Sequence, residues 1–184
     1  MAIEHEYKFI LTDNHPELIQ TLKDSVPEQF IHQIYLNKSI RFRKIVKISK
    51  KKTSTKFYHT FKKRIDDDVL EIESEITPED FMMVQKADCI CSLHKYRYTI
   101  KQIHGQWDID FLVKHETSNE VYIAMAECEQ PKGFEVVVPE VLKPYIRFEV
   151  PYEHSTYFSN FKMCDQEYAK QALIINRLML KEFQ

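Results

Sequence analysis

Polar and apolar residues alternate along most of the chain, and this pattern predicts β-strands. The first such stretch, AIEHEYKFIL (residues 2–11), has Glu4, Glu6 and Lys8 at every second position, with Tyr7 and Phe9 between them. Alternate side chains of a strand share a face, so we expect charge on one face and bulky apolar groups on the other. Similar patterns predict strands at about 2–11, 38–49, 55–64, 69–76, 92–102, 106–113, 120–129 and 145–150.

Three segments have the features of helices. Residues 15–24 follow Asn14 as a candidate cap, residues 77–86 begin with the capping sequence TPED, and residues 165–182 carry an apolar stripe at helical spacing. Many short strands with few helices predict an α+β fold. We expect a closed or nearly closed eight-stranded antiparallel β-barrel with a charged interior, flanked by helices, in a single domain that covers residues 1–184.

Composition excludes several classes of function. The chain has 184 residues, of which 43% are hydrophobic and 29% charged, as in globular proteins. Only two residues are glycine, which excludes glycine-rich phosphate loops, and the balance of 26 basic and 28 acidic residues gives no electrostatic case for nucleic acid. The four cysteines have no metal-binding spacing, and no long apolar run occurs. We therefore expect a cytoplasmic protein without membrane or nucleic-acid partners.

The charged half of the alternation recurs in seven of the predicted strands, mostly as pairs of one sign. The basic members are Lys8, Arg41, Arg43, Lys62, Lys95 and Arg97, and the acidic members are Glu4, Glu6, Glu71, Glu73, Asp108, Asp110, Glu127 and Glu129. One interpretation is an ordinary sheet whose charged face lies in water. The segregation of signs and the number of strands favour a second one, in which the charged face lines a barrel. Charges in a lumen must pair, hold metal or contact a charged ligand.

The two sets of charges suggest one kind of ligand. Lysine and arginine suit several phosphate groups, because arginine can bind phosphate through two hydrogen bonds. Carboxylates suit Mg²⁺ or Mn²⁺, which take oxygen ligands and often bridge protein carboxylates to substrate phosphates. A linear polyphosphate with bound metal would satisfy both sets.

Short motifs along nearly the whole chain follow the order seen in one protein family. They are EHEYK (4–8), HQIYL (32–36), RFR (41–43), TFK (60–62), EIESEI (71–76), HKYRY (94–98), WDIDFL (107–112), AECE (126–129) and YFSNF (157–161). The first matches the Glu-x-Glu-x-Lys signature of the CYTH domain, or triphosphate tunnel metalloenzyme, superfamily, and the others resemble its later motifs. Two positions depart from the family pattern, because Val69 and Tyr157 stand where an arginine is frequent. Each departure would weaken one phosphate contact.

The resemblance implies metal-dependent hydrolysis of a triphosphate group, with inorganic tripolyphosphate as the expected substrate and Mg²⁺ or Mn²⁺ as the cofactor. It implies metal binding and catalysis by Glu4, Glu6, Glu127 and Glu129, catalysis and phosphate binding by Lys8, phosphate binding by Arg41, Arg43, Lys62, Lys95 and Arg97, and supporting roles for Glu71, Glu73, Asp108 and Asp110. Thiamine triphosphatase and adenylyl cyclase remain alternatives. A module that binds polyphosphate or nucleoside triphosphate without turnover is another, and the oligomeric state, including a homodimer, stays open.

Overall fold

The computed structural model describes residues 4–13, 15–49, 52–65, 68–131 and 133–181, and side chains for 6–13, 15–49, 52–63, 70–131 and 133–175. Nine strands and four α-helices lie in these residues. The strands are β1 (Glu4–Leu11), β2 (Glu28–Asn37), β3 (Ile40–Ile48), β4 (Thr53–Ile65), β5 (Asp68–Glu75), β6 (Cys91–Lys101), β7 (Gln106–Val113), β8 (Val121–Pro131) and β9 (Ile146–Val150). The helices are α1 (His15–Ser25), α2 (Pro78–Lys86), α3 (Asn160–Met163) and α4 (Gln166–Lys181), with 3₁₀ turns at Lys143–Tyr145 and Tyr152–Phe158.

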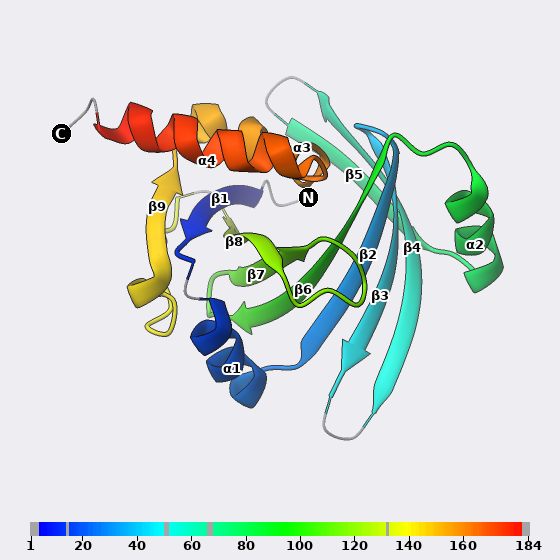
Figure 1. Cartoon of the computed structure of the whole chain (residues 1–184), viewed down its shortest axis with the longest axis horizontal. Helices are drawn as coiled ribbons and strands as arrows, with labels where there is room; N and C mark the ends of the chain where they lie inside the picture. Colours follow the sequence, from blue (N-terminus) through cyan, green and yellow to red (C-terminus); the bar gives the residue numbers. More distant parts are fainter. Residues whose placement is uncertain (1–3, 14, 50–51, 66–67, 132, 182–184) are drawn as a thin grey trace.

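All nine strands belong to one antiparallel sheet, in the order β5-β4-β3-β2-β6-β7-β8-β1-β9. The sheet bends into a concave shape, with α3 and α4 across one end and α2 outside β4 (Figure 1). Among the described residues, no hydrogen-bonded ladder joins the two edge strands β5 and β9. The predicted α+β class is therefore confirmed, but hydrogen bonds do not close the sheet into a barrel.

The prediction of eight strands is wrong by one, because β2 was not recognised. Its sequence, EQFIHQIYLN, contains adjacent buried pairs, Phe30 with Ile31 and Ile34 with Tyr35. A strand in the middle of a sheet that is covered on both faces loses the clean alternation on which strand prediction depends. In the structure β2 joins β3 to β6 at the centre of the sheet.

The three predicted helices are present with similar bounds. Helix α2 has the expected capping box, in which the Asp80 backbone N–H donates to Thr77 Oγ1 at 3.1 Å and the Thr77 N–H donates back to the Asp80 carboxylate at 3.3 Å. The end predicted for α4, residue 182, lies outside the described residues. No helix in the described part of the chain combines the length and the apolar character that a membrane crossing needs.

Two apolar clusters hold the sheet in shape. The first lies on the convex face and packs α1, through Leu18 and Leu22, against Phe9 and Trp107. Cys128 also lies in this cluster, which confirms that it points away from the concave face. The second cluster packs α4 against the concave face of β7, β8 and β1, as Leu112, Ile123, Met125 and Ala169 illustrate. Helices α3 and α4 thus cover one end of the concave face, and the charged residues lie beyond this cluster.

Candidate functional site

The predicted charged residues lie on the concave face, because the strand register places them in rows. Lys8 on β1 is opposite Glu127 on β8, and Glu127 is opposite Asp108 on β7. On the other side of the sheet, Arg41 on β3 is opposite Thr60 on β4, which is opposite Glu73 on β5. The side chain of Glu4 lies outside the described residues, although its backbone pairs with Pro131.

The first group of charges, which we call the acid-rich group, comes from β1, β6, β7 and β8. It consists of Lys8, Lys95 and Arg97 with Glu6, Asp108, Asp110, Glu127 and Glu129. At its centre the buried Asp110 carboxylate accepts hydrogen bonds from Lys95 Nζ at 2.6 Å and from Arg97 Nε and Nη2 at 2.6 Å each. Arg97 also pairs with Asp108. These contacts fix two cations on neighbouring positions of β6.

Burial and neighbouring charges shift the pKa values of this group in different directions. Burial and the adjacent Arg97 lower the pKa of Lys95 to about 8. Burial alone would lower the pKa of Lys8, but ion pairs with Glu127 and Glu6 raise it above its ordinary value. The same pairing holds the pKa of Glu127 well below its usual range, against the opposing effect of burial. Lys8 is therefore a cation held between two carboxylates.

Glu129 is a carboxylate with an excess of negative charge around it. It lies directly opposite Glu6 in the register, and none of the ion pairs of the described residues includes it. Burial, Asp108, Glu127 and Glu6 together raise the pKa of Glu129 to about 7. A bound cation would relieve this repulsion, and carboxylate oxygens are the donors that Mg²⁺ and Mn²⁺ prefer, so the donor chemistry fits such an ion. Within the described residues, however, no three His, Cys, Asp or Glu side chains converge as a metal site.

The second group, which we call the base-rich group, comes from β3, β4 and β5. It consists of Arg41, Arg43, Lys56 and Lys62 with Glu71, Glu73 and Glu75. Arg41 Nη2 lies 2.9 Å from a Glu71 oxygen, and Arg43 pairs with Glu73. The Nε atoms of Arg41 and Arg43 are buried and have no hydrogen-bond partner in the structure. Because buried donors are almost always satisfied, these two atoms indicate a place for an anionic ligand.

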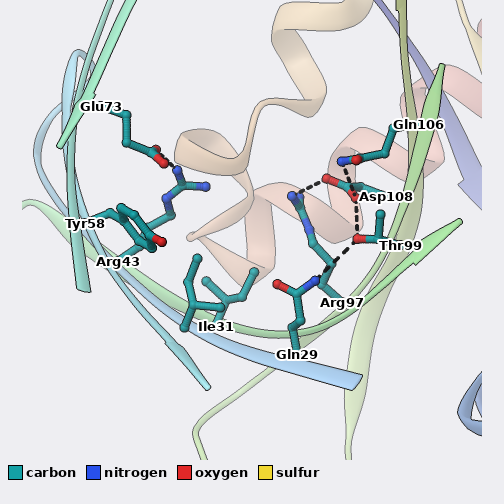
Figure 2. Close-up of a pocket in the computed structure, with 10 residues that line it drawn as sticks. Gln29, Ile31, Arg43, Tyr58, Glu73, Arg97, Thr99, Gln106 and Asp108 are labelled. Atoms are coloured by element: carbon teal, nitrogen blue, oxygen red, sulfur yellow. Dashed lines mark hydrogen bonds and ion pairs between the residues drawn. The ribbon is translucent and has the colours of Figure 1, made fainter. Parts of the chain in front are cut away.

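An uncharged floor from β2 separates the two groups. Gln29 and Ile31 lie between Arg43 on one side and Arg97 on the other (Figure 2). These side chains, with Tyr58, Glu73, Asp108 and others, line a cavity of about 220 Å³. On the described part of this face, every ion pair falls within one group or the other. The base-rich group has four cations and three carboxylates, and the acid-rich group has three cations and five carboxylates.

Sequence reasoning missed several residues of the site. Asn160 at the start of α3 accepts a hydrogen bond from Lys95 Nζ at 3.1 Å. The motif YFSNF contained this asparagine, but nothing in the sequence connected it to Lys95. The uncharged floor was missed because it belongs to β2, which the sequence pattern did not predict as a strand. Two positions, Val69 and Tyr157, differ from the family pattern. The Tyr157 side chain is exposed, with Lys162 Nζ 4.7 Å from its ring centroid, and the side chain of Val69 lies outside the described residues.

Comparison with known proteins finds similarity in solved structures. No protein-family model and no curated protein matches the chain. A putative adenylate cyclase from Bacillus halodurans superposes with a TM-score of 0.51, is 16% identical, and the match covers 86% of this chain and 98% of that one. The inorganic triphosphatase NE1496 gives a TM-score of 0.48 at 18% identity, over 86% and 95% of the two chains. The protein PH1819 from Pyrococcus horikoshii gives 0.45 at 14%, over 77% and 82%.

The similarity concerns the fold, because the identities are below 20%. The putative cyclase, which has the highest TM-score of these three, is a CYTH-domain protein. The resemblance that the sequence motifs predicted is therefore confirmed at the level of the fold.

Proposed function

From a fold shared with CYTH-domain proteins, we propose that this chain hydrolyses a triphosphate group with the help of a divalent metal ion, and that inorganic tripolyphosphate is its substrate. The observation that carries the proposal is the division of the concave face into a base-rich and an acid-rich group across a neutral floor. A polyphosphate chain would complement the first group, and a cation bound to that chain would complement the second.

The cation would be held by Glu6, Glu127 and Glu129, together with Glu4. A divalent ion, when bound, would neutralise charge on the phosphate oxygens and increase the acidity of a nearby water. Lys8 now occupies the space between Glu6 and Glu127, so its ammonium group must leave at least one of these carboxylates to admit the ion. Loading of the metal would thus release Lys8 toward the phosphates.

The protein's own contribution to hydrolysis would be positioning and electrostatic stabilisation. The free Nε donors of Arg41 and Arg43 would bind oxygens at one part of the phosphate chain. Lys95 and Arg97, held by Asp110, would bind another part without having to reorganise. Water would then attack the terminal phosphorus as the bridging P–O bond breaks, giving orthophosphate and diphosphate.

The proposal is tested by phosphate release from tripolyphosphate, ATP and thiamine triphosphate, each with Mg²⁺, with Mn²⁺ or with EDTA. We expect release that needs metal and is fastest with tripolyphosphate. If none of the three substrates releases phosphate in a metal-dependent way, the proposal is wrong. Formation of cyclic AMP from ATP would instead assign the activity named for the similar cyclase structure.

The metal assignment predicts that Glu129→Gln reduces turnover at least a hundredfold, because a neutral amide is a poorer ligand for a hard cation than a carboxylate. Glu149→Gln is the matched control, because Glu149 is an exposed acid on β9. Initial rates at several Mg²⁺ concentrations measure the effect. Retention of full activity by Glu129→Gln would refute the assignment.

A binding module without turnover is the second candidate, and the position of Lys8 favours it. Two of the expected metal ligands already neutralise this lysine in the structure. A module of this kind would bind tripolyphosphate with equal affinity in EDTA and in Mg²⁺ and would release no phosphate. Calorimetry under both conditions separates the two candidates.

A further inference from the structure

Two cysteine residues that are distant in sequence meet at the covered end of the concave face. Cys91 begins β6, on the same face as Lys95, and is opposite Tyr35 in the register. Cys164 follows α3 directly. The Cys91 thiol lies 3.7 Å from the carbonyl oxygen of Phe161, and the Cys164 thiol lies 3.4 Å from that of Asn160, so both contact the same turn of α3.

The two thiols also interact with each other. Their proximity lowers the pKa of Cys91 and raises the pKa of Cys164. Both side chains are half-buried, so a small molecule has access to them, whereas Cys89 is exposed and Cys128 lies in the core. Of the four cysteines, Cys91 and Cys164 are thus the pair that the fold brings together.

The surrounding contacts hold this arrangement in place. The Tyr35 and Phe161 rings pack edge to face with centroids 5.2 Å apart, and the Tyr122 hydroxyl donates to the carbonyl oxygen of Met163 at 2.8 Å. These contacts anchor α3 to β2 and β8 on either side of the cysteine pair. A disulfide would require the two sulfur atoms, which both contact this turn, to approach to about 2.05 Å.

We propose that Cys91 and Cys164 form a redox modification site, at which hydrogen peroxide converts the two thiols into one reversible disulfide that ties α3 to the start of β6. This proposal goes beyond the proposed function and does not depend on it. The loop that the disulfide closes contains β6, β7, β8 and β9.

The chemistry proceeds in two steps. The Cys91 thiolate, which is the more readily formed of the two, attacks one peroxide oxygen and the O–O bond breaks. The leaving hydroxide takes up the proton that the Cys91 thiol had lost, so that a sulfenic acid and a water molecule result. The Cys164 sulfur then attacks the sulfenic sulfur, the S–O bond breaks, and a second water leaves. One peroxide is reduced to two waters, and two thiols are oxidised to one disulfide.

The modification would act on the candidate site through Asn160. This residue binds Lys95 through its side chain and contacts the Cys164 thiol through its carbonyl group. A disulfide would keep the α3 turn, and with it Asn160, in contact with Lys95.

The test treats the reduced full-length protein with a small excess of hydrogen peroxide under native conditions, and alkylates the remaining thiols. Mass spectrometry should show the loss of two thiols per chain and a Cys91–Cys164 linked peptide, both reversed by dithiothreitol. The oxidised protein should melt about 5–10 °C higher, because closing a long loop restricts the unfolded chain. Cys91→Ser and Cys164→Ser should each abolish the link and the shift, and Cys89→Ser should keep both.

Three results would overturn the proposal. They are a Cys89–Cys91 link, disulfide-linked dimers as the main product, or oxidation of Cys89 while Cys91 and Cys164 stay reduced. The peptide map of the unmodified sequence alone is sufficient to detect each of them, so the conclusion does not require that the serine variants fold.

Discussion

Asp110 holds two cations of the candidate site even though its own side chain is completely buried. A buried carboxylate is tolerated only when its oxygens are satisfied, and Lys95 and Arg97 satisfy both of them here. Burial opposes ionisation, yet the two cations hold the pKa of Asp110 below its ordinary value. At the scale of the residue, the site therefore depends on paired charges whose partners cannot be removed singly.

We expect Asp110→Asn to lower the free energy of unfolding by about 3 kcal/mol, because Lys95 and Arg97 would lose their buried counter-ion. Urea denaturation measures the change. The control is Glu167→Gln, which removes an exposed partner of Lys170 and should have a much smaller effect, because solvent screens exposed ion pairs. A cost for Asp110→Asn as small as the control's would show that the buried pairs do not stabilise the fold.

Arg43→Gln should weaken the binding of tripolyphosphate about tenfold to a hundredfold, since one charge-assisted contact would be lost. Lys44→Gln is the control, because Lys44 is the next residue on β3 and points to the opposite face, toward Glu116. Calorimetry without metal measures binding independently of turnover. Equal losses for the two variants would mean that net charge, rather than the unpartnered Nε of Arg43, attracts the anion.

At the scale of the element, the turn between β6 and β7 fits closely against β8. A Cβ atom at Gly105 would lie 2.7 Å from the carbonyl oxygen of Glu129 and 2.9 Å from Cβ of Gln130. The only other glycine, Gly133, has open space around it but a φ of 94°. The two glycines are thus needed for different reasons, close approach in one case and backbone conformation in the other.

Gly105→Ala should destabilise the protein by about 2–3 kcal/mol, because the turn or β8 must shift to admit the methyl group. Gly133→Ala should cost about 1 kcal/mol, the usual penalty for a left-handed backbone. Thermal unfolding of both variants measures the difference. A smaller effect at position 105 than at position 133 would contradict the tight packing.

The sequence allowed prediction of elements whose signals are local, and not of those that depend on distant partners. The cap at Thr77 and the alternating charges of β1 follow from neighbouring residues, and the structure contains both. Strand β2 was missed because its two faces are covered by residues distant in sequence, such as Phe161 on Tyr35 and Phe81 on His32. Asn160 was missed for a similar reason, since its contact with Lys95 depends on how the C-terminal segment folds over the sheet. Closure of the sheet into a barrel stays a prediction, because the separation of the edge strands depends on the curvature of the whole sheet.

At the scale of the whole molecule, stability should depend on pH through histidines on the convex face. His32 and His94 stack with centroids 4.3 Å apart beside Phe81, and the charges nearest to them are Glu116, Lys44 and His115. Burial and His94 lower the pKa of His32 to about 4. Between pH 6.5 and 4 the unfolded chain therefore binds a proton that the folded chain does not.

Stability from His32 is present above pH 6.5 and is lost as the pH falls toward 4. The ring is only partly buried, so solvent screening limits the loss to about 1–2 kcal/mol. His32→Gln should make the dependence of unfolding free energy on pH shallower in this range, as urea titrations at several pH values would measure. A wild-type slope that persists in His32→Gln would point to other groups.

The uncharged floor of β2 has a consequence for the rigidity of the sheet. Each charged group neutralises much of its own charge. Across the floor the described side chains of this face form no ion pair, so no electrostatic contact on this face holds strands β3, β4 and β5 to the strands of the acid-rich group. A ligand that contacted both the base-rich and the acid-rich group would link these two parts of the sheet and stabilise its curvature, which no hydrogen-bonded ladder between the described edge strands fixes. Ligand capture and stiffening of the scaffold would then be a single event.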